Sequence, residues 1–523
     1  MDFRLTEKKQ VFKSLPLIYQ QLIKGGGLSL LSGVALWLPF HNPQFFPLAW
    51  VGLIPFLGFL ICRPSWKFTL MGHGLMTLIY LGGVLYWIPA VLVTYGNLSW
   101  AVGLVAFLLM LIVLSLVILP FTLLTRWTAG KSVMLSLTCA PGFWLLTELC
   151  RDFFLFNGFP WGSLGYSQHP YLWIIQIADI GGVYLVSALL VGANASCLGA
   201  FRFRTVKPLV GFGILFLTIN LYGSYRVYWW QPEEGSTLKV ALVQPNIELS
   251  QDRKYYALQY YEALPEYYRR AVKAGAEWVI FPEAPNPFQY QEDFYFKTFW
   301  EREVDTYKSY LLFNTASLEA DPDPLYFNSA LLLGPDGKEI YRYDKIRLVP
   351  FGEYVPFKNW FGAFLEPFVQ EVAEFSPGEE LQIGSIAGTQ FATLICYEGI
   401  FPELSRLFAR KGAQVFVSIT NDSWYGQSTA PRQHLEMILF RSIETRKPFL
   451  RCANSGYSAT IDYLGRSSQE IGLFEKGVLM TQVAGNNYRT IYSYTGDWIS
   501  IVVVVATFAL ALVGTKPRFV SKK

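Results

Sequence analysis

Three residues of this sequence carry groups that together can perform nucleophilic catalysis: the carboxylate of Glu283, the amine of Lys345 and the thiol of Cys396. Each stands at or just beyond the end of a predicted β-strand. A carboxylate can take the thiol proton and later return one, while an ammonium favours the thiolate and stabilises an oxyanion. Taken singly, each has an ordinary explanation, because free cysteines usually pack as small hydrophobes and most Lys and Glu side chains are solvated.

The composition of the 523-residue chain predicts a membrane protein. Hydrophobic residues make up 52% and charged residues only 16%, which is too apolar for a soluble chain of this length. The aromatic content of 17% suits side chains placed at membrane interfaces. The net charge of +4 is small, and nothing in the sequence indicates nucleic-acid binding.

Eight apolar runs predict eight transmembrane helices, seven of them before residue 225 and one near the C-terminus. The runs cover residues 28–40, 46–62, 70–93, 101–124, 133–149, 173–201, 209–222 and 498–513. The first, second, fifth and seventh are shorter and individually weaker. We expect a basic N-terminus at 1–24, seven spans within 25–225, one soluble domain at 235–487, a final span at 497–514 and a basic tail at 515–523.

Basic residues predict the orientation of these spans. If each run crosses once, the N-terminus and alternate loops share one side and carry most of the charge: Arg63, Lys67, Arg126, Lys131, Arg202, Arg204 and Lys207. The opposite loops hold only Arg151. Positive loops are typical of the cytoplasmic side, so both termini should be cytoplasmic and the 235–487 domain outside.

Within 235–487, β-branched and aromatic strands alternate with amphipathic segments of helical length, which indicates an α/β domain. The predicted strands are 239–243, 278–281, 310–314, 329–333, 391–395, 415–419 and 449–453. The predicted helices are 260–274, broken or kinked near Pro265, 402–411 and 433–446. In such sheets, functional residues usually lie just beyond the carboxyl ends of the strands.

The contexts of the three reactive residues resemble the nitrilase, or carbon-nitrogen hydrolase, superfamily. They are Pro282-Glu283, Tyr343-Asp344-Lys345 and Ile395-Cys396-Tyr397-Glu398. The resemblance implies an αββα sandwich with Glu283 as general base, Lys345 as oxyanion stabiliser and Cys396 as nucleophile. By family position, Glu353, Tyr397 and Glu398 look like a supporting shell. Glu353 could orient Lys345, or it could serve only to hold a local turn.

The whole chain resembles one membrane-bound branch of that superfamily, the apolipoprotein N-acyltransferases. Further matching segments are 348–356, 421–426 and 158–161, with the single residues Glu148, Arg151, Gln433, His434, Arg441, Glu444 and Arg446. The resemblance implies a bacterial inner-membrane enzyme with a periplasmic catalytic domain. It would move an acyl chain from a phospholipid, usually phosphatidylethanolamine, through a Cys396 thioester to the N-terminal amine of a diacylglyceryl apolipoprotein.

Several aromatic segments could contact lipid or simply pack. Residues 356–377 have apolar side chains at helical spacing, which fits either a lid dipping into the membrane or a helix on the domain's own core. Residues 288–300 and 153–171 are better explained by packing or interfacial belts, with Trp161 and Tyr166 at headgroup level. Glu148 and Asp179 lie near predicted span ends and could be functional, solvated or ion-paired.

Cysteine and histidine usage indicates no metal and no cofactor. Cys62, Cys139, Cys150 and Cys197 fall in or near spans, and Cys452, within a predicted strand, should be structural. The four histidines are scattered without ligand spacing. One departure from the family is that residues 244–256 lack the Trp often found there.

Two other functions fit the same sequence. A membrane-tethered amidase would use the same residues, with water in place of an amine resolving the thioester. A transporter or lipid-binding scaffold would carry an inactive nitrilase-like domain.

Overall fold

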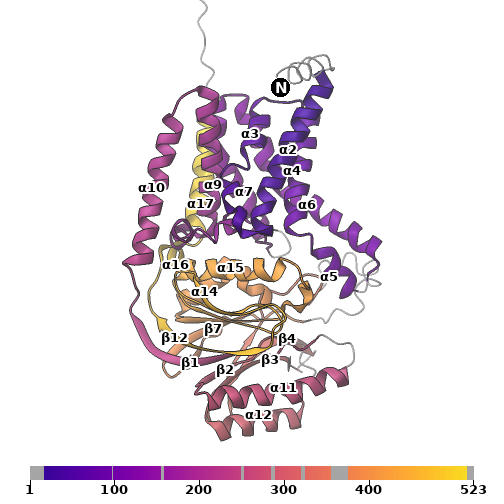
Figure 1. Cartoon of the computed structure of the whole chain (residues 1–523), viewed down its shortest axis with the longest axis vertical. Helices are drawn as coiled ribbons and strands as arrows, with labels where there is room; N and C mark the ends of the chain where they lie inside the picture. Colours follow the sequence, from indigo (N-terminus) through magenta and orange to yellow (C-terminus); the bar gives the residue numbers. More distant parts are fainter. Residues whose placement is uncertain are drawn as a thin grey trace, which may run out of the picture.

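The computed structural model describes residues 17–514 except 97, 155–157, 249–252, 284–288, 320–323 and 355–374. Figure 1 shows long helices at one end of the molecule and a layered domain of sheets and helices at the other. The long helices are formed by the first half of the sequence. Helix α17 (Trp498–Val513), near the C-terminus, lies beside them.

The helical part consists of long helices joined by short ones. The long helices are α2 (Leu17–His41), α4 (Trp66–Val84), α6 (Trp100–Ala129), α7 (Val133–Phe154), α9 (Ala178–Phe203) and α10 (Lys207–Tyr228). The short ones are η1 (Pro43–Trp50), α3 (Ile54–Ile61), α5 (Ile88–Thr94), η2 (Leu164–Gln168) and α8 (Leu172–Ile175). Many of their apolar side chains are exposed in the isolated chain, as expected for surfaces that face lipid.

Among the described residues, five helical stretches are long and apolar enough to cross a membrane, or six if a bent pair counts as one span. This supports a membrane protein, and α17, at 16 residues, is a shorter apolar helix. The number of eight spans stays a prediction. The basic ends 1–16 and 515–523 lie outside the described residues.

Two predicted runs are not single straight helices. The run 70–93 is divided between α4 and α5, which meet at 56° and form the bent pair, and Pro89 stands in the first turn of α5. Proline lacks the N–H that would continue a preceding helix. The run 173–201 is broken at Gly181 and Gly182, and Gly182 has a φ of +70° that favours glycine.

The domain contains two six-stranded sheets. The first has the order β12 (Gly477–Asn486), β1 (Glu234–Gln244), β2 (Trp278–Ile280), β3 (Tyr310–Glu319), β4 (Leu325–Leu333), β5 (Glu339–Asp344). The second has the order β11 (Ser467–Ile471), β10 (Ser458–Ile461), β9 (Phe449–Ala453), β8 (Val415–Thr420), β7 (Thr389–Ile395), β6 (Gly384–Ile386). All seven of these predicted strands are present, and β5 corresponds to the strand end expected before Lys345. The short strand β6 and the C-terminal strands β10, β11 and β12 are additional.

The two sheets pack face to face and helices cover their outer faces (Figure 1). The rings of Trp278 and Phe391 meet between the sheets with centroids 4.9 Å apart. Helices α11 (Arg253–Lys273) and α12 (Phe294–Tyr307) cover one side, and α14 (Pro402–Lys411) and α15 (Ala430–Thr445) the other. This is the predicted αββα sandwich. Pro265 lies inside α11, which is one helix and not two.

Strand directions bring the predicted reactive residues to one edge. Strands β1, β2 and β3 are parallel, and β5 runs in the same direction because both β3 and β5 are antiparallel to β4. Strands β7, β8 and β9 are also parallel to one another. The carboxyl ends of β2, β5 and β7 precede Glu283, Lys345 and Cys396, so the fold can gather these residues between the sheets.

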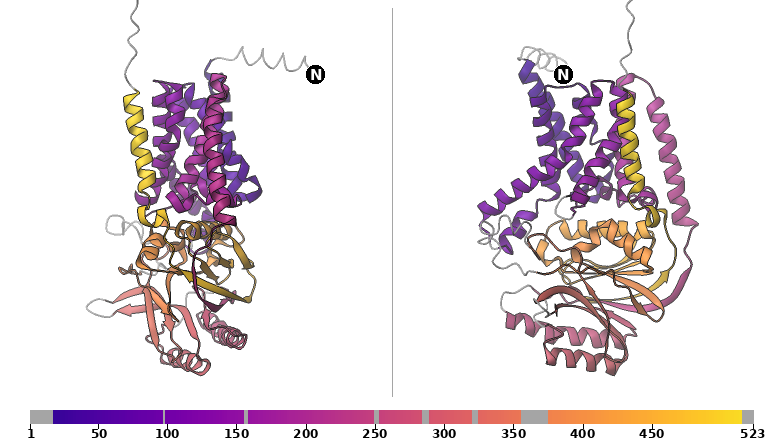
Figure 2. Two further views of the ribbon diagram at one scale, coloured as in Figure 1. Left: turned by 90° about the vertical axis from the view of Figure 1, so that its left-hand side faces the viewer. Right: turned by 180° about the vertical axis from the view of Figure 1, so that it is seen from behind.

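The sandwich is joined to the long helices through α15, which contacts α9. Both views of Figure 2 place α14 and α15 between the sheets and the long helices, and α12 at the opposite end. Asp179 at the start of α9 receives ion pairs from Arg446 and Arg226, each at 2.8 Å. Asp179 is therefore ion-paired and buried, one of the alternatives that the sequence allowed.

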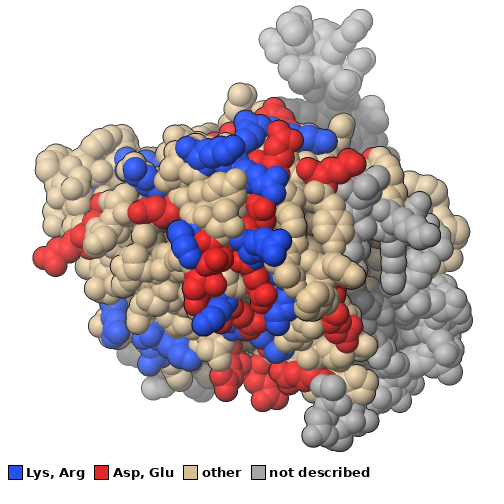
Figure 3. All heavy atoms as spheres, turned by 90° about the horizontal axis from the view of Figure 1, so that it is seen from below, with Lys and Arg blue, Asp and Glu red and all other residues tan. Residues whose placement is uncertain are grey.

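The aromatic segment 288–300 does not lie near the long helices. Its described part leads into α12 at the far end of the domain, where Phe296 and Trp300 are buried in the domain's own core. Figure 3 shows that far end, where acidic and basic side chains are interspersed over the face. A mixed surface of this kind is typical of a solvated face. Packing therefore accounts for Phe296 and Trp300, whereas Phe294 and Tyr295 of the same segment are exposed.

Candidate active site

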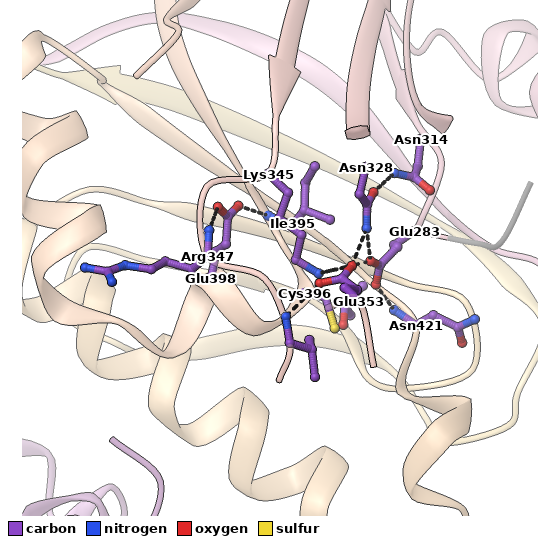
Figure 4. A network of polar contacts seen from close by, with 12 residues as sticks. Glu283, Asn314, Asn328, Lys345, Arg347, Glu353, Ile395, Cys396, Glu398 and Asn421 are labelled. Carbon is purple, nitrogen blue, oxygen red and sulfur yellow. Dashed lines mark hydrogen bonds and ion pairs between the residues drawn. The ribbon is translucent and has the colours of Figure 1, made fainter. Parts of the chain in front are cut away.

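Glu283 and Lys345 meet at the edge formed by the strand ends (Figure 4). Nζ of Lys345 lies 3.5 Å from Oε1 of Glu283 and 2.8 Å from Oε1 of Glu353. The Lys345 side chain is almost fully buried. Burial works against its charge, but the carboxylates of Glu353 and Glu283 together raise the pKa of the Lys345 ammonium. Lys345 therefore stays protonated near neutral pH.

An amide bridges the two carboxylates. Nδ2 of Asn328 donates to Oε1 of Glu283 at 3.0 Å and to Oε1 of Glu353 at 2.8 Å. The carbonyl oxygen of the same side chain accepts from Asn314 at 2.7 Å, which sets the orientation of the Asn328 amide (Figure 4). The other oxygen of Glu283 accepts from the backbone N–H of Asn421 at 3.2 Å. Glu283 is thus held from both sheets.

Cys396 ends β7 and begins the short helix η4 (Cys396–Ile400). It has a φ of +51°, in the left-handed region that non-glycine residues rarely adopt. The side chain is buried, and Figure 4 shows it beside Glu283, Glu353 and Lys345. Burial and the Glu283 carboxylate raise the pKa of the Cys396 thiol, while Lys345 lowers it. The resting thiol is protonated, so a base must take its proton during any attack.

Glu398 connects the loop after β5 to the end of β7 through hydrogen bonds. Its Oε1 accepts from the Tyr343 hydroxyl (2.7 Å) and from the backbone N–H groups of Ile346 (2.7 Å) and Arg347 (3.1 Å). Its Oε2 accepts from the backbone N–H of Ile395 at 2.8 Å. Burial raises the pKa of Glu398 to about 7, although these hydrogen bonds favour the charged form. Glu398 ties the segment that carries Lys345 to the one that carries Cys396.

A buried ion pair between Asp422 and Arg451 contacts His434, which in turn contacts Cys396. Asp422 begins η5 (Asp422–Tyr425) after β8, and it accepts from Arg451 of β9 at 2.6 Å. Oδ1 of Asp422 lies 3.1 Å from Nδ1 of His434 on α15. Nε2 of His434 lies 3.2 Å from the carbonyl oxygen of Cys396. His434 is fully buried beneath the candidate nucleophile.

Tyr397 and Trp161 connect the site to the long helices. The hydroxyl of Tyr397 donates to the carbonyl of Gly158 at 3.1 Å, and Nε1 of Trp161 donates to Gln433 at 2.7 Å. The Trp161 ring packs against Trp87 and Tyr425 with centroids 5.0 and 5.8 Å apart. Trp161 and Tyr166 are 2% exposed. They are buried at the junction with the domain, which favours packing over direct contact with lipid.

The remaining predicted residues have structural surroundings. Sγ of Cys452 on β9 donates to the carbonyls of Val243 and Ile280 at 3.2 Å, between the two sheets, which confirms its structural place. Glu148 accepts from Trp144 (2.9 Å) and from the backbone of Leu164 (2.8 Å). Most of the segment 356–377, including its apolar side chains, lies outside the described residues. Within the described ranges, no three His, Cys, Asp or Glu side chains gather as a metal would require.

Three polar residues of the site did not stand out in the sequence. Asn314 and Asn328 are ordinary strand residues by type, and Arg451 is a charged residue inside a predicted buried strand. Only Arg451 carried a usable signal, because a charge in the middle of a buried strand needs a partner. The asparagines could not be found this way, since their partners come from distant segments.

Comparison with known proteins agrees with this geometry. Residues 32–196 match the family described as the apolipoprotein N-acyltransferase N-terminal domain, and residues 239–492 match the family described as carbon-nitrogen hydrolase. The latter range contains every residue of Figure 4. The chain therefore has both parts that its sequence predicted, a nitrilase-like domain and a membrane part.

Relatives cover both parts together. An apolipoprotein N-acyltransferase of Geobacter metallireducens is 36% identical over 92% of this chain and 94% of its own length. Proteins of the same name from Vibrio cholerae and Nitrosomonas europaea are 31% and 29% identical, covering 89% and 81% of this chain and 92% and 84% of their own lengths. Since the similarity to the first of these extends over nearly the full length of both proteins, this chain belongs to the apolipoprotein N-acyltransferase family.

Proposed function

We propose that this chain transfers a fatty acyl group from a membrane phospholipid to the N-terminal α-amino group of a diacylglyceryl-cysteine apolipoprotein, through a thioester on Cys396. The observation that carries the proposal is the meeting of a buried thiol, an ammonium and a carboxylate at the strand ends of a nitrilase-like domain. The acyltransferase family to which the chain belongs and the long apolar helices of this chain both fit a substrate that resides in a membrane.

In the first step, the Cys396 sulfur attacks the carbonyl carbon of the phospholipid ester while Glu283 takes the thiol proton. The tetrahedral oxyanion is stabilised by the Lys345 ammonium and the backbone N–H of Tyr397. Collapse of this intermediate breaks the C–O bond. Glu283 returns the proton to the alcohol oxygen, so the products are a lysophospholipid and the Cys396 thioester.

In the second step, the amine of the apolipoprotein attacks the thioester carbon. Glu283, again a carboxylate, takes a proton from the attacking nitrogen, and the same two donors hold the second oxyanion. Collapse breaks the C–S bond, and the proton on Glu283 returns to the sulfur. The product is an N-acylated lipoprotein, and the thiol is restored.

Supporting roles follow from the contacts. Glu353 holds Lys345 at 2.8 Å, and its other oxygen accepts from the backbone of Val349 at 2.8 Å, so it both orients the ammonium and fixes a turn. Glu398 sets the spacing between the Lys345 and Cys396 segments. Tyr397 contributes its backbone N–H and anchors the loop to Gly158 through its hydroxyl.

The proposal also covers the membrane location of the protein, its orientation and its acyl donor. We place the protein in the bacterial inner membrane with eight spans and cytoplasmic termini, because its basic residues cluster in alternate loops and at both ends. The 235–487 domain is then periplasmic. Phosphatidylethanolamine is the proposed donor, and neither a cofactor nor a metal takes part.

Intact-protein mass spectrometry tests the first step. Purified protein incubated with a phospholipid of known acyl chains should gain the mass of one acyl group on Cys396, and Cys396→Ala should gain none. Cys452→Ala is the matched control, because its thiol is also buried but lies between the sheets. Absence of an acyl group on wild-type Cys396, with Cys396→Ala as active as wild type, would overturn the covalent mechanism and favour a scaffold.

Addition of a diacylated lipopeptide tests the second step. The acyl group should leave Cys396 and appear on the peptide's amine, with one lysophospholipid formed for each peptide acylated. Release of free fatty acid without an N-acylated peptide would show that water resolves the thioester, as in the tethered amidase.

A further inference from the structure

His434 takes no part in the proposed proton transfers, but its side chain contacts the backbone of Cys396. It is fully buried on α15, and Nε2 lies 3.2 Å from the carbonyl oxygen of Cys396. A carbonyl oxygen can only accept, so Nε2 carries the hydrogen and donates. The ring is therefore protonated at Nε2 when it makes this contact.

On the other side of the His434 ring, Nδ1 faces the buried ion pair between Arg451 and Asp422. Nη2 of Arg451 lies 2.6 Å from Oδ2 of Asp422 and 3.3 Å from Nδ1 of His434. Oδ1 of Asp422 lies 3.1 Å from the same Nδ1, so the ion pair as a whole holds this side of the ring. Burial opposes the charge of Asp422, but Arg451 and His434 hold the pKa of Asp422 near 2. The ring is thereby held in the orientation that presents Nε2 to the carbonyl oxygen of Cys396.

The Cys396 carbonyl belongs to the same peptide group as the N–H of Tyr397. A trans peptide is planar, and its C=O and N–H point in opposite directions. A hydrogen bond that fixes the carbonyl also fixes the direction of the N–H. Cys396 is the first residue of the short helix η4 but has a φ of +51°, outside the helical range, so the contact from α15 adds a hold on this peptide from outside its own segment.

We propose that His434 is a positioning residue that locks the Cys396–Tyr397 peptide plane and so keeps the Tyr397 N–H aimed at the oxyanion. This role rests on the proposed acyl-transfer function. In it, a contact from α15 fixes the orientation of one oxyanion donor, the N–H of Tyr397. The same helix packs against α9, and Gln433, the neighbour of His434, accepts from Trp161. The oxyanion donor is thus connected to the junction with the long helices.

Two chemical probes of Cys396 separate this role from a general effect on folding. A short activated ester such as p-nitrophenyl acetate acylates the thiol through a tetrahedral oxyanion. Iodoacetamide alkylates the same thiol by displacement at a saturated carbon, which forms no oxyanion. Loss of an oxyanion donor costs about 10²- to 10³-fold in rate, and a misdirected donor costs part of this.

The variants are His434→Leu, which removes the donor, and His434→Gln, whose Nε2 can occupy a similar position and donate. His169→Leu is the matched control, because His169 is another histidine with little exposure, 9% of its side chain, and it contacts α15 through Glu436 at 3.2 Å. In His434→Leu we expect acylation by the ester to be about 10- to 100-fold slower and alkylation to stay within about twofold of wild type. His434→Gln should recover most of the acylation rate, and His169→Leu should match wild type in both.

Equal loss of acylation and alkylation in His434→Leu would show that the residue only maintains the fold, and would overturn the proposal. Unchanged acylation, or His434→Gln as slow as His434→Leu with alkylation normal, would do the same. Both probes are free of phospholipid and lipopeptide. Failure of lipid transfer in the wild type would therefore contradict the proposed function, while the ratio of acylation to alkylation still decides the role of His434.

Discussion

Nζ of Lys345 lies 2.8 Å from Oε1 of Glu353, closer than the 3.5 Å that separates it from Glu283. The lysine is thus held mainly by a residue that the proposed mechanism does not use for proton transfer. Glu283 keeps a weaker contact with the ammonium and remains available to accept the thiol proton. The first prediction tests this division between the two carboxylates.

Glu353→Gln should slow acylation of Cys396 by phospholipid about 10- to 100-fold, because a displacement of the ammonium by about 1 Å is enough to cost that much. The apparent KM for phospholipid should change little. Single-turnover mass spectrometry of the thioester measures the rate. Glu380→Gln is the matched control, since Glu380 is exposed and contacts Gln382. A Glu353→Gln enzyme as fast as wild type would show that Glu353 only fixes the local turn.

The second prediction concerns the ionisation of the thiol. Burial and Glu283 raise the pKa of Cys396 and Lys345 lowers it, so the two neighbouring charges should act in opposite directions on thiolate-dependent alkylation. Below the thiol pKa, the rate rises tenfold per pH unit with the thiolate fraction. At pH 8.5 we expect Glu283→Gln to react with iodoacetamide about tenfold faster than wild type, and Lys345→Met about tenfold slower.

Peptide mass spectrometry of Cys396 after timed alkylation measures these rates across pH 7 to 9.5. Cys396→Ser identifies any signal from other thiols. The Glu283→Gln enzyme should alkylate faster yet form no thioester from phospholipid, because its base is gone. Shifts of the same sign in both variants would contradict the charge arrangement.

The third prediction concerns Glu398, whose two oxygens accept from four donors. In Glu398→Gln, the amide nitrogen must face a backbone N–H or the Tyr343 hydroxyl, leaving a buried donor without an acceptor. This should lower the free energy of unfolding of the domain by about 1–3 kcal/mol. Tyr343→Phe removes one donor and leaves the carboxylate charged, so its loss should be smaller. Chemical denaturation followed by tryptophan fluorescence measures both, and equal stability of Glu398→Gln and wild type would contradict the prediction.

The burial of Glu398 also predicts a pH dependence. Burial raises its pKa to about 7, above the ordinary value near 4.5, so the folded state binds the proton more tightly than the unfolded state. The stability that Glu398 contributes is complete below about pH 4.5 and is lost as the pH rises toward 7. Between pH 5 and 8, the unfolding free energy of wild type should fall relative to that of Glu398→Gln, so that the advantage of wild type shrinks as the pH rises.

The fourth prediction concerns the junction between α9 and the domain. Asp179 pairs with both Arg446 and Arg226, so Asp179→Ala leaves two buried guanidinium groups without their carboxylate. We expect a loss of about 3–5 kcal/mol and a clearly lower midpoint of thermal unfolding in detergent. Arg446→Met should be milder, because Asp179 keeps Arg226. Asp305→Ala, which removes an exposed ion pair with Lys308, should change the midpoint very little. Arg446→Met as damaging as Asp179→Ala would contradict this order.

Much of the domain could be predicted from local patterns. The strands before Glu283 and Cys396 end within one residue of their predicted ends, because a buried strand shows as a short apolar run bounded by a turn signal. The exposed, charged strand β11 and the nearby β12 were not predicted. β11 has no apolar run of its own and pairs with β10, whereas β12 carries the short apolar run 478–480 and pairs with β1 from the other end of the domain.

In the membrane part, the direction of the helices could not be predicted from the sequence pattern. The run 70–93 is uniformly apolar, yet the chain bends by 56° between α4 and α5 near Pro89. Hydrophobicity predicts that a segment is shielded from water but says little about its direction. Trp161 was similarly assigned by its residue type, and its burial against Tyr425 follows only from the docking of the two parts.

By itself, the sequence determined which residues could perform the chemistry, since Glu283, Lys345 and Cys396 each follow a recognisable strand in a family context. Only the tertiary structure decided what holds them. Asn328 bridges two carboxylates, and His434, 38 positions beyond Cys396, donates to the carbonyl of the nucleophile. Such contacts depend on the register of the strands and on the packing of one layer on another, which place residues together that no local pattern connects.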